Sequence, residues 1–298
     1  MEDEVESLNR AFASRLRNRG QSLLFSRGPA GFIFATVQNP FCHARFCLHG
    51  AQVLGFAPAG GRELLWLSPR VCYSRDRAIR GGIPLCFPWF GKLPGLPARP
   101  QHGFARLLDW SVTEAAEDEA GKTRISLACP PAPEEYSEWK DLEARLELEF
   151  GMELRLRLTV RNSGTVRHEC TAALHSYFKI SHIGNIRVLS REEAHAPEEL
   201  RAGIQPRGDY DRIFEGTAGP YRIEDSGCDS FIIVNKEKSR STVIWNPGPE
   251  KSAAMSDMGA AGAATMVCVE AARAAGDRMV LEAGGADSLG LSIGLTPR

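Results

Sequence analysis

Strict alternation of apolar and polar residues between Leu146 and Val160 is the feature that most restricts how this chain can fold. Every even-numbered position in this stretch is apolar, and the odd-numbered positions hold Glu, Arg, Thr or Gly. A repeat of two sends successive side chains to opposite faces of a β-strand, whereas a helix needs a repeat near 3.6. The stretch therefore predicts two strands with one face in water, which turn or bulge at Gly151.

Shorter runs of the same kind recur from about residue 30 to the end of the chain, separated by Gly, Pro, Asn and Asp. They cover residues 32–37, 45–49, 64–67, 110–113, 124–128, 231–234, 242–245, 266–271 and 289–295. Many antiparallel strands with turns between them favour a large all-β sandwich, mainly antiparallel, over an α/β fold. The 298 residues contain no internal repeat and no linker, so we expect a single domain over residues 30–298.

Residues 1–29 are expected to form an N-terminal extension. Val5, Leu8, Phe12 and Leu16 fall near one face of a helix, which predicts that the extension is helical. Its Arg and Ser residues leave open the remnant of an organelle transit peptide, but Glu and Asp argue against one. No apolar run reaches the length of a membrane span, and we expect a cytoplasmic protein.

The charge balance and the cysteine pattern limit the kinds of binding partner, cellular compartment and metal that can be expected. With 36 basic and 37 acidic residues the net charge is −1, so the chain carries no footprint for nucleic acid or a membrane surface. Its eight cysteines are scattered without a C-x-x-C pair, which indicates reduced thiols in a reducing compartment. The spacing of Cys42-His43 and Cys47-x-His49 fits no common zinc site, so we expect no metal.

Residues 78–91 combine apolar and aromatic residues with two prolines, three glycines and Arg80. Because proline removes a backbone donor and glycine is entropically costly, neither a helix nor a central strand is expected here. We expect a rigid loop that forms the wall of a pocket. Gln101, His102 and Arg106 follow shortly after it, and together these residues predict a site for a polar, anionic small molecule.

Two further segments offer acid–base groups. A strand over residues 171–178 would place His175 between Ala173 and Tyr177 on one face, with room around an imidazole that titrates near neutral pH. Glu270 ends an apolar strand, where a carboxylate is either a surface group or half-buried with a raised pKa. For His175 the alternative is a histidine satisfied within the structure, and the residues alone decide neither case.

Two other loops are candidates. The loop after Asn246-Pro247 is equally well explained as a loop without a function, and an acidic residue in the loop of residues 209–214 is usually just solvated. Asn246-Pro247 after a strand predicts a turn and then a helical turn, and residues 209–214 form a polar turn that leads into a strand. The chain has no nucleotide-binding loop, nucleophile elbow or kinase signature.

Five motifs occur together and in a fixed order. They are Arg80-Gly81-Gly82-Ile83-Pro84, Gln101-His102-Gly103-Phe104-Ala105-Arg106, His175-Ser176-Tyr177-Phe178, Trp245-Asn246-Pro247 with Lys251-Ser252, and Cys268-Val269-Glu270. This combination resembles the hexose-6-phosphate mutarotase (glucose-6-phosphate 1-epimerase) branch of the aldose 1-epimerase family, from about residue 30 to the C-terminus. The first two motifs are specific to that branch, and the histidine and glutamate motifs are shared more widely.

The resemblance implies a galactose-mutarotase-like β-supersandwich with a few short helices and no metal or organic cofactor. It implies that His175 is the general acid and Glu270 the general base. It also implies four contacts to the sugar phosphate, from Arg80, Gln101, Arg106 and Asp211. The chain departs from the family in two places. Gly248 stands where relatives often have an aromatic residue, and the segment between His175 and Asp211 is short.

The chemistry agrees with these residues. Interconversion of the α and β anomers of a hexose 6-phosphate, glucose 6-phosphate first, needs a base at the C1 hydroxyl and an acid at the ring oxygen. We therefore expect Glu270 ionised and His175 protonated at the start, with Phe87, Trp89 or Tyr177 stacked on the sugar. We expect a monomer. The alternatives are a mutarotase for unphosphorylated aldoses and a sugar-phosphate-binding or sensor protein without catalysis.

Overall fold

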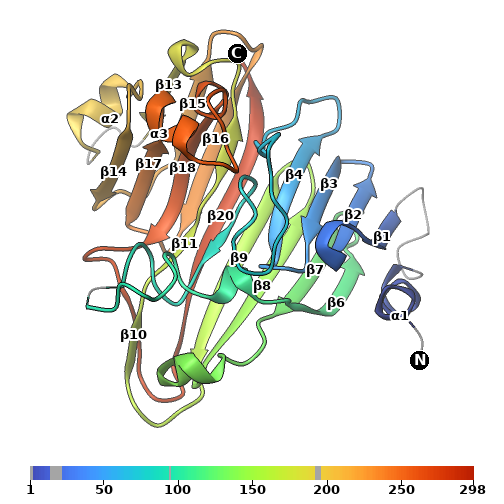
Figure 1. Cartoon of the computed structure of the whole chain (residues 1–298). Coiled ribbons are helices and arrows are strands. Elements are labelled where there is room, and N and C mark those ends of the chain that lie inside the picture. The colour runs from blue at the N-terminus through green and yellow to red at the C-terminus, as the bar shows by residue number, and fades with distance from the viewer. Residues whose placement is uncertain (1–2, 14–21, 94, 192–195) are drawn as a thin grey trace.

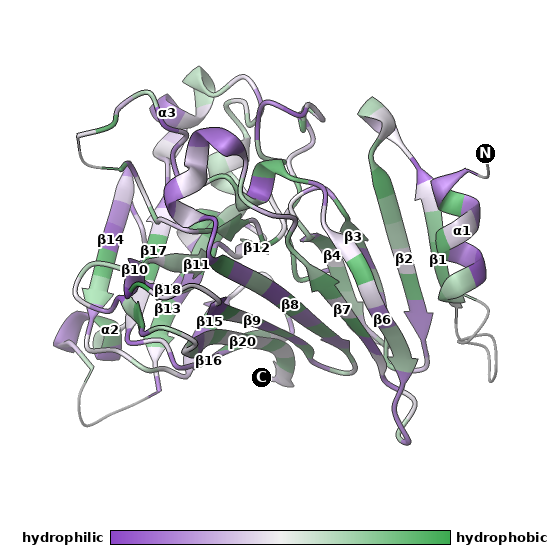
Figure 2. Ribbon diagram, turned by 90° about the horizontal axis from the view of Figure 1, so that it is seen from below, coloured by the Kyte–Doolittle hydropathy of each residue, from purple (hydrophilic) through white to green (hydrophobic). Residues whose placement is uncertain are grey.

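The alternating stretch forms a β-hairpin. Strand β8 (Leu142–Phe150) pairs antiparallel with β9 (Leu154–Asn162), and the chain reverses at residues 151–153. Apolar side chains of both strands are buried and most of the charged ones face outward, which gives the striped ribbons of Figure 2. The predicted strand pair is thus confirmed, with its turn at Gly151. The structure, a computed structural model, describes residues 3–13, 22–93, 95–191 and 196–298.

The hairpin lies within an eight-stranded antiparallel sheet, which crosses the molecule from β13 to β6 (Figure 1). Its strands in spatial order are β13 (Ile186–Ser190), β15 (Tyr221–Asp225), β16 (Ser230–Glu237), β20 (Ala286–Pro297), β9, β8, β7 (Thr123–Ala128) and β6 (Ser111–Glu117).

Three other sheets, also antiparallel, complete the architecture. The four-stranded sheet contains β1 (Ser22–Arg27), β2 (Ile33–Asn39), β3 (Cys42–Cys47) and β4 (Gln52–Pro58). The six-stranded sheet contains β14 (Tyr210–Glu215), β17 (Ser241–Asn246), β18 (Met266–Arg273), β11 (Ala172–Leu174) and β5 (Leu85–Cys86), and β12 (Tyr177–Lys179) also pairs with β18. The two-stranded sheet contains β10 (His168–Cys170) and β19 (Met279–Leu281).

One apolar core joins the eight-, four- and six-stranded sheets. It includes Phe150 of β8, Phe46 of β3 and Val269 of β18, and the rings of Phe46 and Phe150 stack 6.2 Å apart. Burial of alternate side chains from facing sheets is the main source of stability in such a sandwich. The expected all-β, mainly antiparallel fold is therefore confirmed.

The helices are short. They are α1 (Glu4–Ala11), α2 (Glu198–Ala202) and α3 (Gly248–Ala254), with 3-10 turns at residues 29–31, 105–107, 134–139, 183–185 and 262–264. Helix α1 carries Val5 and Leu8 of the predicted apolar face, and Leu16 lies outside the described residues. Strand β1 pairs with β2, so the boundary expected at residue 30 falls between two paired strands.

The structure differs from the predicted strands in two places. Residues 64–67 make only isolated bridges, at Leu65 and Leu67. The loop of residues 78–91 contains the two-residue strand β5, which pairs with β11 at the edge of the six-stranded sheet; this agrees with the expectation that no helix or central strand forms here. The strand expected over residues 171–178 is interrupted at His175 and Ser176, which separate β11 from β12.

Candidate active site

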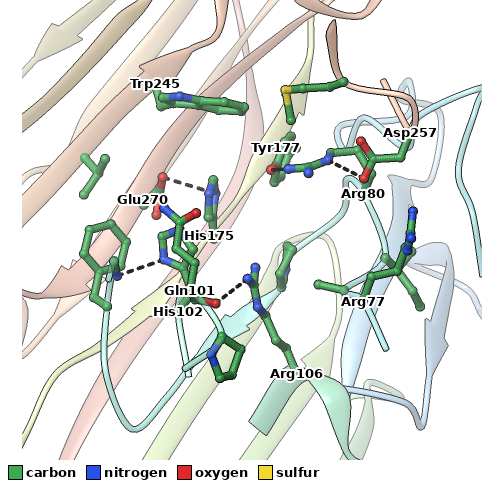
Figure 3. A pocket seen from close by; sticks show the side chains of 18 of the residues that line it. Arg77, Arg80, Gln101, His102, Arg106, His175, Tyr177, Trp245, Asp257 and Glu270 are labelled. Carbon is green, nitrogen blue, oxygen red and sulfur yellow. Dashed lines mark hydrogen bonds and ion pairs between the residues drawn. The ribbon is translucent and has the colours of Figure 1, made fainter. Parts of the chain in front are cut away.

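A cleft of about 540 Å³ opens on the six-stranded sheet. Side chains of β14, β17 and β18 form its floor, and α3 contributes Lys251 to its rim. Its walls come from the loops at residues 76–80, 90–91 and 100–107 (Figure 3). The segment expected to form a pocket wall therefore does so.

Strand periodicity explains how a carboxylate reaches the floor of the cleft. In β18, Val267 and Val269 face the main core, whereas Cys268 and Glu270 face the opposite way. Glu270 pairs in register with Val243 of β17, which also lines the cleft. The strand continues to Arg273, so Glu270 is a mid-strand residue and not the strand end that the sequence suggested.

The break between β11 and β12 positions His175. Its backbone N–H donates to the carbonyl of Pro84 at 3.0 Å, and the N–H of Tyr177 donates to the carbonyl of Gly82 at 2.9 Å. The imidazole stacks on the ring of Tyr177 with centroids 4.8 Å apart, and the edge of Trp245 approaches it at 5.9 Å. The wall loop and two aromatic rings thus fix the imidazole.

Two glycines allow the wall loops to approach this closely. Gly82 has φ +64°, and a Cβ there would lie 2.1 Å from the carbonyl oxygen of Val53. Gly103 has φ +73°, and its Cβ would lie 2.0 Å from the carbonyl oxygen of Phe87. No larger residue fits either position, so the glycines of both motifs serve backbone packing.

His175 and Glu270 face each other on the floor (Figure 3). Nδ1 of His175 lies 3.1 Å from Oε1 of Glu270, and the two side chains are 9% and 1% exposed. Within the described part of the chain, His175 Nδ1 and Glu270 Oε2 have no hydrogen-bond partner. Such unpartnered buried atoms are costly unless a ligand satisfies them.

Burial controls the protonation of this pair. It lowers the pKa of His175 well below the ordinary value, and positive charge on Arg106 lowers it further. It raises the pKa of Glu270 well above the ordinary value, and the nearby Asp211 adds to this shift. The free protein therefore favours a neutral imidazole and a protonated carboxyl. This differs from the expected ionised glutamate and protonated histidine, because burial penalises both charges.

The two expected arginines have different surroundings. Arg80 donates from Nε to Asp257 at 3.1 Å and from Nη1 to the Tyr177 hydroxyl at 3.0 Å. Arg106 donates from Nη2 to the backbone carbonyl of Gln101 at 2.6 Å. Its Nε is buried without a partner, and no carboxylate of the described residues forms an ion pair with it. The charge of Arg80 is thus offset, and that of Arg106 is not.

All six residues predicted for the site line this one cleft. They are Arg80, Gln101, Arg106, His175, Asp211 and Glu270. Asp211 reaches it from β14, opposite Trp245 in register, and burial raises its pKa. Of the aromatic residues expected to stack on a sugar, Tyr177 lines the cleft, whereas Phe87 and Trp89 are buried away from it.

The sequence placed His102 at the site with Gln101 and Arg106 but gave it no separate role, and the structure supplies one. Its Nδ1 accepts a hydrogen bond from the N–H of Gly91 at 3.1 Å, so the neutral ring carries its proton on Nε2. Burial lowers its pKa to about 3. The ring meets His175 edge to face at 5.6 Å. His102 is therefore a fixed neutral donor, and its place in the Gln101–Arg106 motif was the available signal.

One group of side chains has the composition of a metal site. Among the described residues, the ligand atoms of His175, Cys268 and Glu270 lie within 4.8 Å of one another. Burial raises the pKa of the Cys268 thiol well above its ordinary value, and the Arg80 and Arg106 charges lie close by. A protonated thiol and nearby cations disfavour a bound cation, so the group suits proton transfer better.

Solved structures share this fold. The crystal structure of "a putative mutarotase (YeaD)" from Salmonella typhimurium matches with a TM-score of 0.79 and 27% identity, over 93% of this chain and 94% of that chain. A galactose mutarotase-like protein from Clostridium acetobutylicum matches with a TM-score of 0.71, 15% identity and coverage of 94% and 100%. The class is therefore that of galactose mutarotase-like β-sandwiches.

Sequence comparison gives the family. The family model described as aldose 1-epimerase matches residues 34–293. A protein of Escherichia coli K12 named "Putative glucose-6-phosphate 1-epimerase" is 34% identical over 80% of this chain and 82% of its own length. A Salmonella typhimurium protein of the same name is 31% identical over 92% and 95%. The chain belongs to the aldose 1-epimerase family and is an isomerase of that kind.

A search of the described helices for one with the length and hydropathy of a membrane span finds none.

Proposed function

We propose that this protein interconverts the α and β anomers of a hexose 6-phosphate, with glucose 6-phosphate as the first substrate to test. The observation that carries the proposal is Arg106, a partly buried cation in the cleft whose Nε is buried without a partner and which has no carboxylate partner among the described residues. A phosphate dianion would satisfy this guanidinium. The similarity to proteins named as glucose-6-phosphate 1-epimerases supports the same substrate.

In the proposed mechanism, Glu270 removes the proton of the C1 hydroxyl. The bond between C1 and the ring oxygen breaks, its electron pair stays on the ring oxygen, and His175 supplies a proton there. The open-chain aldehyde rotates about C1–C2 and closes on its other face. On closure His175 takes the proton of the former ring oxygen and Glu270 gives its proton to the C1 carbonyl oxygen, which restores the starting pair. Each positioned acid or base is worth about 10²–10⁴-fold in such a step.

The substrate itself is expected to prepare the pair for this chemistry. A C1 hydroxyl that donates to the unpartnered Oε2 of Glu270 favours the carboxylate. A phosphate near Arg106 and Arg80 offsets the positive charges that lower the pKa of His175, which favours the imidazolium. The neutral pair of the free protein and the ionic pair of the reaction contain the same number of protons. Binding therefore needs to move one proton within the site.

The other lining groups fit a sugar. His102 offers an N–H donor and Asp211 an acceptor for hydroxyl groups, and Gln101 offers an amide at the rim. Tyr177 and Trp245 present apolar surface beside His175 for the pyranose. The expected monomer, the cytoplasmic location and the absence of nucleic-acid or membrane partners stay predictions.

The test is the rate of anomer exchange, measured by NMR or polarimetry on fresh α-D-glucose 6-phosphate and on α-D-glucose. We expect acceleration of both and a higher kcat/KM for the phosphorylated sugar. Equal or higher kcat/KM for glucose would favour a mutarotase for free aldoses. Tight phosphosugar binding with no acceleration would favour a sugar-phosphate sensor.

A further inference from the structure

A third arginine, Arg77, lines the cleft three positions before Arg80 and takes no part in the contacts described above. Its side chain is 47% exposed. Within the described residues its one ion-pair partner is Asp76, whose carboxylate lies 3.7 Å from Nε. An exposed pair at this distance contributes little, so the guanidinium is available to a ligand.

Arg77 and Arg106 come from different wall loops, and both line the cleft. In Figure 3 Arg77 lies on the side where Arg80 bonds to Asp257, and Arg106 lies between Arg77 and the pair of His175 and Glu270. Asp257 already offsets the charge of Arg80, which leaves Arg77 and Arg106 as the arginines able to meet an anion there.

The chemistry of the reaction restricts where a phosphate can lie. A phosphate on C1 would block the hemiacetal, so a substrate that places its C1 hydroxyl at Glu270 carries the phosphate at another carbon. A phosphate has several acceptor oxygens and is bound best by more than one guanidinium fork. The cleft offers two such forks, Arg77 and Arg106, from different wall loops.

We propose that Arg77 binds the substrate phosphate together with Arg106, and that Arg77 determines the preference for phosphorylated over free hexoses. This inference rests on the proposed function. It assigns to Arg80 a different task, which is to hold Tyr177 against His175. It predicts that sugars with a free C1 hydroxyl and a distal phosphate or sulfate are the ligands of this cleft.

The test compares Arg77→Ala with Arg75→Ala. Arg75 lies in the same loop and is 60% exposed, but it bonds to Asp109 at 2.5 Å and does not line the cleft. Arg75→Ala therefore removes one positive charge from the same loop, as Arg77→Ala does. For each variant, kcat and KM are measured with α-D-glucose 6-phosphate and with α-D-glucose at constant ionic strength, and the melting temperature reports folding.

Arg77→Ala is expected to raise KM for glucose 6-phosphate about tenfold, which corresponds to one charged hydrogen bond at a partly exposed site. Its kcat, and both parameters with glucose, should stay within about twofold of wild type, because the proposed contact is to phosphate alone. Arg77→Lys should recover part of the loss, since an ammonium binds phosphate as a point charge. Arg75→Ala should leave both KM values unchanged.

Two results would overturn the assignment of Arg77 and leave the proposed function intact. One is an equal rise of KM for both sugars, or the same effect from Arg75→Ala. The other is that Arg106→Ala loses the preference for the phosphorylated sugar while Arg77→Ala keeps it. A wild-type protein without any preference for the phosphorylated sugar would instead contradict both proposals.

Discussion

Nδ1 of His175 and Oε1 of Glu270 lie 3.1 Å apart on the floor of the cleft, where burial lowers the pKa of the imidazole, raises the pKa of the carboxyl and so disfavours both charged forms. Two groups at this distance titrate as a unit, so their pKa values belong to the pair. A neutral resting pair avoids the cost of two buried charges. It also keeps one proton ready for transfer between the groups or to a substrate.

Removal of either member of the pair should abolish most of the activity. We expect His175→Ala and Glu270→Gln each to lower kcat by about 10²–10⁴-fold, because each removes one proton-transfer step. The double variant should lose little more than either single variant, since groups that act together are not additive. NMR exchange rates at saturating glucose 6-phosphate measure the loss, and calorimetry checks that the phosphosugar still binds. Full turnover in either single variant would refute its assigned role.

Glu270 should also make the protein less stable as pH rises. Burial raises its pKa in the folded state above the ordinary 4.5, so between these values the folded protein holds a proton that the unfolded chain has released. Stability contributed by this proton is full below pH 4.5 and is lost as pH rises toward the folded pKa. The slope is up to about 1.4 kcal/mol per pH unit.

Glu270→Gln lacks this titration. Its free energy of unfolding should therefore increase relative to that of wild type as pH rises from 4.5. Urea unfolding of both proteins at several pH values measures the difference, and His175 is present in both. Parallel stability curves would show that Glu270 has an ordinary pKa in the folded protein. Such a variant would be inactive but more stable, which is a common trade at catalytic sites.

The fold could be predicted because its strands expose one face. The alternation in residues 142–162 fixes both the hairpin and its register, since a shift by one residue would bury every charge. Strand β18 is harder to interpret, because both of its faces are buried and its apolar run shows no period. For that reason the sequence placed Glu270 at a strand end and left its burial open.

The sequence predicted which residues line the cleft but not the contacts among them. Motif order brought together the residues that line the cleft, and the resemblance supplied the expected roles. The Arg80–Asp257 contact joins residues 177 positions apart, and nothing local to either residue signals it. Likewise, the charge state of His175 and Glu270 follows from burial by distant segments. Long-range packing and electrostatics therefore account for what the motifs could not supply.

Tyr177 is expected to act as a positioning residue for His175. Its hydroxyl accepts from Arg80, and its ring stacks on the imidazole. Tyr177→Phe keeps the ring and removes the hydroxyl, so we expect kcat to fall about 3–10-fold with a small change in KM, in line with one lost hydrogen bond. Asp257→Asn should have a similar effect through Arg80.

Kinetics with glucose 6-phosphate separate kcat from KM for both variants, and the melting temperature controls for misfolding. If Tyr177→Phe raised KM about tenfold with kcat unchanged, the hydroxyl would contact the substrate directly. The positioning role would then be wrong.

Gly248 should tolerate no side chain. It has φ +67°, and a Cβ would lie 2.5 Å from the carbonyl carbon of Gly208 and 2.7 Å from the backbone nitrogen of Asp209. Asp209 in turn accepts from Lys251 at 3.1 Å, next to Asp211 in the cleft. We expect Gly248→Ala to cost about 1–2 kcal/mol for the left-handed backbone and about 1–3 kcal/mol more for the collision.

Gly60 supplies the matched control, because it has φ +70° with nothing near its Cβ position among the described residues. Gly60→Ala should cost the backbone term alone, about 1–2 kcal/mol, and leave KM unchanged. Gly248→Ala should also raise KM for glucose 6-phosphate, since moving the segment of residues 208–209 displaces Asp211. Urea unfolding and steady-state kinetics of both variants give the comparison. Equal losses of stability would mean that the loop yields freely to a side chain at position 248.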